Sequence, residues 1–314
     1  MSRKKYTKPP LPFQDQLNQL ISRGLVVNNQ SKAISYLNSI SYYRISAYFL
    51  PYQLKKDTFN ANTTFTQIIQ TYMFDKDLRL LVFDCIERLE IAIRTQFIYS
   101  MALHYNDAHW QDNHNHFAVF KDKKGNIIDV FKKFQNTIDR ALKSDKPEVF
   151  INHYKKTYSS PKNPPSWMSF ELLSFGELSR IYQGLKENKD KKRIASYFDV
   201  HPTVFTSWLH TLTYVRNLCA HHARLWNRDL AIEPNRLLKP KGNWIGSNFQ
   251  NNKRVFYFLC VLKYMLDRAN PTNTLTNRIA TLFEKYPNVP IQFLGIPSDV
   301  KGDLLDWKNE PLWK

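Results

Sequence analysis

The sequence of 314 residues contains few glycines, few cysteines and no long apolar run. Its 8 glycines form neither a Gly-x-Gly-x-x-Gly string nor a phosphate-loop string, which argues against dinucleotide and nucleoside-triphosphate folds. The three cysteines, Cys85, Cys219 and Cys260, are far apart and odd in number, so we expect buried thiols in a reducing cytoplasm. No stretch approaches 18 consecutive apolar residues, so we expect neither secretion nor a membrane span.

The composition is that of a folded and strongly basic protein. The contents of 43% apolar and 14% aromatic residues exclude a disordered tail, and the length suits one large or two moderate domains. The 45 Lys and Arg against 27 Asp and Glu give a formal net charge of +18. An acidic polymer is therefore the expected partner, although a basic surface that serves only solubility is the alternative.

Apolar residues recur at steps of three and four along most of the chain, which predicts an all-α fold. The strongest pattern predicts a long helix over residues 65–104. Further helices are expected over about residues 14–23, 31–43 with Ser31 as N-cap, after Pro164-Pro165, and over 202–224, 255–266 and 275–283. We divide the chain into an N-terminal helical region (1–70), a helical core (71–270) with a basic insertion at about 104–163, and a C-terminal tail (271–314).

One short run combines a permanent cation, a carboxamide and a titratable imidazole: Arg216-Asn217-Leu218-Cys219-Ala220-His221. Arginine binds phosphate with a rigid, always charged fork, and histidine can both take and give a proton near neutral pH. Cleavage of RNA without a metal needs a group that moves a proton and a group that stabilises extra negative charge on phosphorus. The run therefore indicates phosphodiester chemistry.

Helical geometry places Asn217 and His221 on one face, with Arg216 about 140° from His221 around the axis. Arg216 must then reach with its long side chain, or another element or a second subunit must complete the site. An Arg-x4-His pattern also occurs by chance, with the arginine in solvent and the histidine in the core. Spacing alone does not separate these interpretations.

Four separate blocks of the chain resemble the abortive-infection proteins of bacteria, the AbiD/AbiF-like group within the HEPN superfamily. The blocks read SISYYRISAYFLPY from Ser39, YMFDKDLRLLVFDCIERLEIAIRTQ from Tyr72, PPSWMSFELLSFGELSRIY from Pro164, and VRNLCAHHARLWNRDL from Val215. They occur in the family's order and extend over about residues 12–235. The resemblance implies a HEPN-like helical bundle with additional N- and C-terminal helical segments. It also implies a metal-independent endoribonuclease, a homodimer that brings two motifs together, and a role in antiviral defence.

With the resemblance in view, we assign hypothetical roles to residues of this chain. Arg216 would hold the scissile phosphate and His221 would act as general acid or base. Asn217 would position the substrate or His221. A Glu-x3-Arg feature of the family maps onto Glu90 and Arg94, so that Glu90 would orient Arg216 or His221 and Arg94 would bind phosphate. The alternative for Glu90 and Arg94 is an ordinary surface ion pair.

Further basic residues are expected to bind RNA: Arg44, His222, Arg224, Lys191, Lys192 and Arg193. The charged runs 121–125, which includes Lys123, and 132–133 would extend such a surface through phosphate contacts that carry little sequence information. A solvated face is the competing interpretation of each run, and His222 would assist or simply pack. The aromatic residues around Arg44, from Tyr42 to Tyr52, fit either core packing or base stacking.

The four histidines His104, His109, His114 and His116 raise the possibility of a zinc site. No cysteine lies near them and their spacing is not a standard zinc pattern, so we expect no metal and no cofactor. The competing function is a non-catalytic module that holds a small structured non-coding RNA. Such a module needs Arg216 and the lysine surface but no proton-transfer group at position 221, and the sequence does not separate the two functions.

Overall fold

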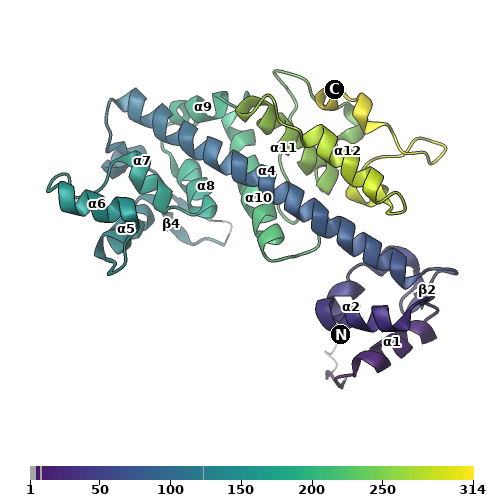
Figure 1. Cartoon of the computed structure of the whole chain (residues 1–314). Helices are drawn as coiled ribbons and strands as arrows, with labels where there is room; N and C mark the ends of the chain where they lie inside the picture. The colour runs from purple at the N-terminus through teal and green to yellow at the C-terminus, as the bar shows by residue number, and fades with distance from the viewer. Residues whose placement is uncertain (1–4, 8, 123) are drawn as a thin grey trace. The chain divides into compact units, whose positions relative to one another are not determined.

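The computed structural model describes residues 5–7, 9–122 and 124–314 (Figure 1). In this part of the chain it contains twelve α-helices, short 3-10 turns and two antiparallel pairs of short strands, which confirms the predicted all-α class. Within the same residues, no helix combines the length and the apolar character that a bilayer span requires.

The chain packs into two compact units. Unit 1 consists of Met1–Arg79 and Ile279–Ile291, and unit 2 consists of Leu80–Arg278 and Gln292–Lys314. Two helices, α4 (Phe65–Tyr105) and α12 (Leu275–Lys285), contribute residues to both units. Helix α4 confirms the long helix predicted over residues 65–104, whereas the predicted division into three regions stays a prediction.

Unit 1 is built from short elements: α1 (Phe13–Ser22), α2 (Gln30–Ile40), α3 (Tyr42–Ser46), η1 (Leu50–Tyr52), β1 (Gln53–Lys55) and β2 (Thr58–Phe59). The helix predicted over 31–43 is wrong at both ends. Asn29, and not Ser31, is the N-cap of α2, because its side chain accepts a hydrogen bond from the Lys32 N–H at 2.9 Å. Ser41 has a φ of 77°, which ends α2, and its hydroxyl then caps α3.

The aromatic run around Arg44 is partly buried and partly exposed. Tyr48 and Phe49 are buried, and the Tyr48 hydroxyl donates to Asp75 Oδ2 at 2.6 Å beside the buried ion pair of Asp75 with Arg79. Burial and the neighbouring Asp75 carboxylate raise the pKa of Tyr48. Tyr43 is 88% exposed, as a stacking platform would be.

Unit 2 contains the predicted motif. Its helices are α5 (Val130–Lys143), α6 (Val149–Thr157), α7 (Ser166–Ser169), α8 (Phe175–Gly184), α9 (Asn188–Ser196), α10 (Pro202–Ala220) and α11 (Val255–Ala269). Strands β3 (Val119–Lys121) and β4 (Ile127–Asp129) form a hairpin. The turns in or next to this unit are η2 (Trp110–Asp112), η3 (His114–His116), η4 (Phe170–Leu172), η5 (Ser247–Phe249), η6 (Ile291–Leu294), η7 (Trp307–Asn309) and η8 (Pro311–Trp313).

Helix α10 packs on α8 and α9, and α8 also packs on α5 (Figure 1). Within the predicted basic insertion, Val130, Phe134 and Ile138 of α5 are buried, so this region contributes to the core of unit 2. Helix α11 is buried at every position from Val255 to Leu266. These contacts give α10 a rigid support on its apolar side.

Candidate active site on helix α10

Helix α10 separates an apolar face from a polar face. Phe205, Trp208, Leu212, Val215 and Cys219 are all buried, as the apolar pattern predicts. Asn217 and His221 are exposed. These two predicted site residues of α10 therefore point away from the core, where a polymer can reach them.

The C-terminus of α10 lies at the motif itself. We predicted that the helix extends to Arg224, which is wrong, because His222 adopts a left-handed conformation with a φ of 55°. The His222 N–H donates to the Cys219 carbonyl at 3.0 Å and the Ala223 N–H to the Leu218 carbonyl at 2.8 Å. These two bonds are the Schellman arrangement that ends many helices. His221 is thus the C-cap residue, and its imidazole stands at the end of the helix.

The segment after the motif is anchored in the core. Leu225 and Trp226 are fully buried, and the Trp226 ring packs edge-on against Phe293 with 5.4 Å between centroids. Arg254 donates to Asn227 Oδ1 at 3.2 Å and pairs with Asp229 at 2.9 Å. The turn that ends α10 is therefore anchored at both ends, by the packing of α10 before it and by the contacts of Trp226 and Asn227 after it.

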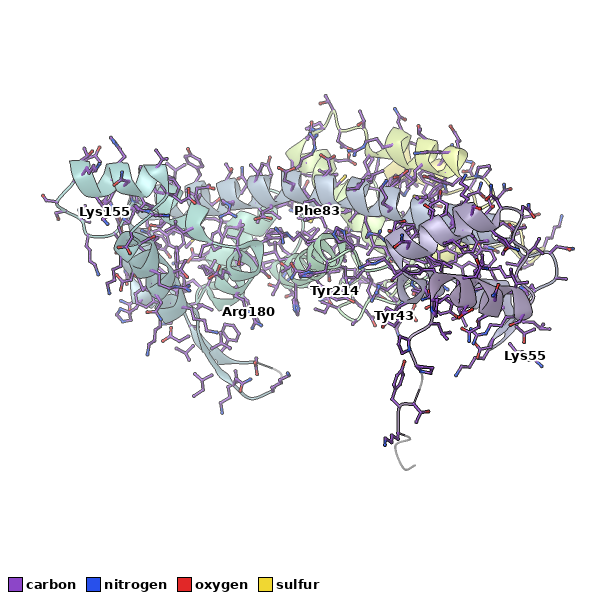
Figure 2. All side chains as sticks on the ribbon, turned by 60° about the horizontal axis from the view of Figure 1, so that its bottom comes forward. Tyr43, Lys55, Phe83, Lys155, Arg180 and Tyr214 are labelled. Carbon is purple, nitrogen blue, oxygen red and sulfur yellow. The ribbon has the colours of Figure 1, made fainter. Side chains whose placement is uncertain are left out.

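Arg216 is half-buried and lies against α4. Its guanidinium carbon is 5.5 Å from the ring centroid of Phe83, which is labelled on α4 in Figure 2. A cation over an aromatic face is attracted by the ring quadrupole, so this contact fixes the guanidinium. Because Arg216 and His221 are about 140° apart around the axis, one chain presents the two groups in different directions.

Glu90 and Arg94 pair with each other, with 3.0 Å between Glu90 Oε1 and the Arg94 guanidinium. The buried Arg94 also donates to the carbonyl oxygens of Phe170 and of Leu173, the latter at 3.1 Å. Within the described residues, neither side chain forms a hydrogen bond or ion pair with Arg216 or His221. The contacts of Arg94 position the turn between α7 and α8, and the roles predicted for Glu90 in catalysis and Arg94 in RNA binding stay predictions.

The lysine and arginine residues predicted on α9 face different surroundings. Lys191 is half-buried and donates to the Gln183 carbonyl at 2.8 Å, and burial lowers its pKa. Lys192 is exposed, whereas Arg193 lies 3.1 Å from His104 Nε2. The three side chains thus have different neighbours, and RNA binding by them stays a prediction.

The remaining predicted RNA-binding residues come from both units. Arg44 is exposed on α3 in unit 1. Arg224 is half-buried after the motif, where its carbonyl accepts a hydrogen bond from Arg228. Lys123 lies outside the described residues.

The four histidines of the zinc hypothesis do not meet in one cluster. Across the described residues, no group of three or more His, Cys, Asp or Glu side chains has an arrangement that could hold a metal ion. His116 packs against the Tyr105 ring with 4.0 Å between centroids, and its burial lowers its pKa although the Asp190 charge opposes this. Cys85, Cys219 and Cys260 are buried thiols, as predicted.

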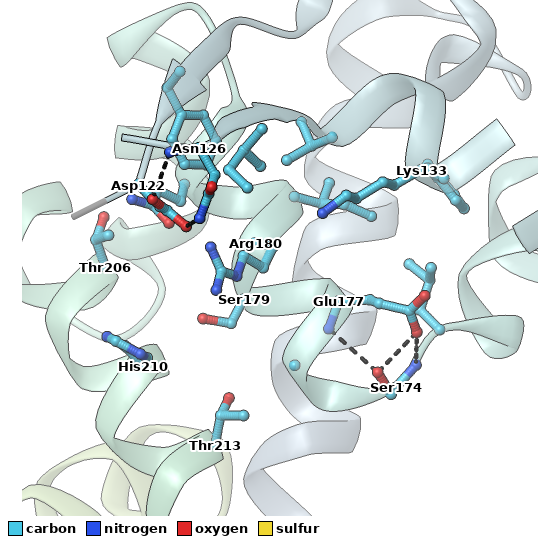
Figure 3. Close-up of a pocket in the computed structure, with 18 of the residues that line it drawn as sticks. Asp122, Asn126, Lys133, Ser174, Glu177, Ser179, Arg180, Thr206, His210 and Thr213 are labelled. Carbon is cyan, nitrogen blue, oxygen red and sulfur yellow. Dashed lines mark hydrogen bonds between the residues drawn. The ribbon is translucent and has the colours of Figure 1, made fainter. Parts of the chain in front are cut away.

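We did not predict His210 on α10 or Arg180 on α8, which lie together at a groove in front of α10 (Figure 3). A signal for His210 was present in the sequence, because it precedes Asn217 by two helical turns and so shares its face. Arg180 carries no comparable signal, since nothing in a helical pattern tells which exposed cation faces a groove.

The left-handed position of His222 gives a test of its role. If His222 serves as the residue that ends α10, His222→Gly should change the free energy of unfolding by less than about 1 kcal/mol, because glycine adopts this conformation without strain. His222→Val should lower it by about 1–2 kcal/mol. Chemical denaturation of both variants measures the difference. Equal stability of the two variants would contradict this role.

Comparison with known proteins shows which family this chain belongs to. Residues 35–227 match the family described as Abi-like protein, and this segment covers more than half of the chain. The chain belongs to the Abi-like family. The match includes the whole run from Arg216 to His221, and membership suggests a role in abortive-infection defence. No curated protein and no solved structure matches this Abi-like chain.

Proposed function

We propose that this Abi-like protein is a metal-independent endoribonuclease of the HEPN type that acts in antiphage defence. The observation that carries the proposal is the exposed imidazole of His221 at the anchored end of α10, five positions after an arginine held against Phe83. The site thus offers a group that can move a proton and a fixed cation for phosphate. The net charge of +18 fits a polyanionic substrate.

The reaction requires only groups that this chain carries. One His221 removes the proton of the ribose 2′-hydroxyl, and the 2′-oxygen attacks phosphorus while the bond from phosphorus to the 5′-oxygen breaks. Arg216 binds the non-bridging oxygens and stabilises their additional charge. A second imidazole donates a proton to the leaving 5′-oxygen. The products are a 2′,3′-cyclic phosphate and a 5′-hydroxyl.

A homodimer supplies the second imidazole. One motif contains a single histidine at the C-cap and presents Arg216 in a different direction, so it has too few groups for the base and the acid together. Two motifs that face one RNA strand would complete the set. Asn217 shares the polar face of α10 with His221 and would orient either the substrate or the imidazole.

The test is cleavage of total RNA in the presence of EDTA by wild-type protein, His221→Gln and Arg216→Ala. We expect wild-type protein to cleave without free metal, and each substitution to lower the rate at least about 100-fold. His153→Gln is the matched control, because His153 is exposed on α6 outside the motif. Thermal unfolding checks that the variants are folded.

Two results would contradict the proposal. Cleavage by His221→Gln at the wild-type rate would exclude proton transfer by this residue, and loss of cleavage in EDTA would exclude the metal-independent route. If a defined RNA co-purifies but neither the wild type nor any variant cleaves RNA, the result favours the function of a non-catalytic RNA-binding module. Such a module needs no proton-transfer group at position 221.

A further inference from the structure

A large groove lies in unit 2 between the hairpin β3–β4, α5, α8 and α10 (Figure 3). Its volume is about 2180 Å³. Pockets for small molecules have volumes of roughly 300–1,000 Å³, so this groove is larger than a metabolite needs. A segment of a polymer is the better fit.

The groove is electropositive. Among its described lining residues, seven are lysine or arginine and four are aspartate or glutamate. Among the cations, Arg180 lies at the centre of the labelled side chains in Figure 3, with Lys133 of α5 on one side and His210 of α10 on the other.

Three of the four carboxylates already serve local structure. Asp139 pairs with Lys162 at 2.8 Å. Asp122 accepts hydrogen bonds from the Asn126 side chain and from the N–H groups of Lys124 and Asn126, and these bonds lower its pKa. Burial alone would raise the pKa of Glu177, but hydrogen bonds from Ser174 in the α8 capping box and from Thr137 outweigh it and lower the pKa. These carboxylates therefore stay ionised, and the lining is positive because the described cations outnumber the carboxylates.

The polar face of α10 connects the groove with the motif. Thr203, Thr206, His210 and Thr213 line the groove. At 100° per residue, these four positions and Asn217 and His221 fall within a stripe about 80° wide. Asn217 follows Thr213 by about 6 Å along the axis, so the groove leads onto the motif within about one helical turn.

The groove offers cations and hydroxyls but few aromatic surfaces. Among its described lining residues, the aromatic rings are Phe120 and Phe134, and Phe134 is buried. Binding by base stacking uses a series of exposed rings, whereas binding to the backbone uses cations along a channel. The side chains available here therefore suit phosphates and ribose hydroxyls.

We propose that this groove binds the sugar-phosphate backbone of RNA and guides the strand along α10 to the motif. The inference rests on the proposed function, because the strand in the groove is the one cleaved at Arg216 and His221. Arg180 and Lys133 bind its phosphates at the centre of the groove. Binding is independent of base sequence and falls steeply with salt.

The experiment measures RNA binding in the His221→Gln background, so that cleavage does not interfere. The added groove substitutions are Lys133→Gln and Arg180→Gln. The matched control adds Lys156→Gln and Lys189→Gln, which remove the same charge from exposed sites on α6 and α9 outside the groove. The probe is a fluorescein-labelled RNA of mixed sequence, titrated at several salt concentrations.

We expect the groove substitutions to weaken binding at least about tenfold. They should also lower the slope of log K against log salt by about two, because two phosphates are no longer neutralised by the protein. The control should stay within about twofold of the His221→Gln protein. Equal affinities of the groove and control variants would overturn the groove proposal and leave the nuclease proposal to the cleavage assay. Displacement of the RNA by polyglutamate at equal charge concentration would also overturn it, in favour of an acidic protein partner.

Discussion

Co-expression of equal amounts of wild-type and His221→Ala chains should leave about a quarter of the wild-type cleavage rate. In a two-fold symmetric dimer, about half of the random pairs contain one chain of each kind. One His221 of a dimer acts as the base and the other as the acid, so these mixed pairs are inactive and only the quarter of pairs with two wild-type chains cleaves RNA. The prediction follows from the single C-cap histidine that each motif contributes.

Differently tagged chains allow the mixed dimer to be purified and assayed directly. A mixed dimer of wild-type and His221→Ala chains that keeps half of the wild-type rate would show that each site uses the imidazole of one chain only. Cleavage at the full rate by protein that sediments only as a monomer would contradict the dimer itself.

Arg94→Met should lower the free energy of unfolding by about 3 kcal/mol, because it leaves two backbone carbonyls and the Glu90 carboxylate without their buried donor. Only 11% of the Arg94 side chain is exposed, so water compensates little of this loss. Urea denaturation measures the change.

Arg88→Met is the matched control on the same helix. Arg88 pairs with Asp84 at 3.5 Å and its side chain is 55% exposed, so its removal should cost less than about 1 kcal/mol. RNA affinity is the second measurement, and it separates a structural role of Arg94 from phosphate binding. If Arg94→Met keeps its stability but loses RNA affinity, Arg94 binds phosphate as the family resemblance implies.

The helical pattern predicted where helices occur better than it predicted the residues at which they begin and end. The steps of three and four apolar residues located α4 and α11 because burial of a continuous stripe is what such a pattern encodes. The ends depend on single residues instead. Asn29 competes with Ser31 for the cap of α2, and His222 stops α10 although histidine is not a usual residue for a left-handed position.

The motif was visible in the sequence because its residues are close along the chain. The groove could not be predicted in this way. Arg180 and Lys133 come from separate helices, and only the packing of α5 on α8 brings their side chains to one space. Arg94 illustrates the same limit. Its spacing to Glu90 predicted their pairing, but the carbonyls of Phe170 and Leu173 lie more than seventy positions further along the chain.

The hairpin β3–β4 forms one wall of the groove, and its tip should tolerate substitutions and insertions better than the motif does. Its tip is closed by bonds among its own residues, with Asp122 accepting the N–H groups of Lys124 at 2.8 Å and of Asn126 at 2.9 Å. An exposed tip of this kind tolerates changes of length and charge. If the groove binds RNA as proposed, changes at this tip would alter the wall that the strand contacts, while the motif stays on a helix that the core constrains.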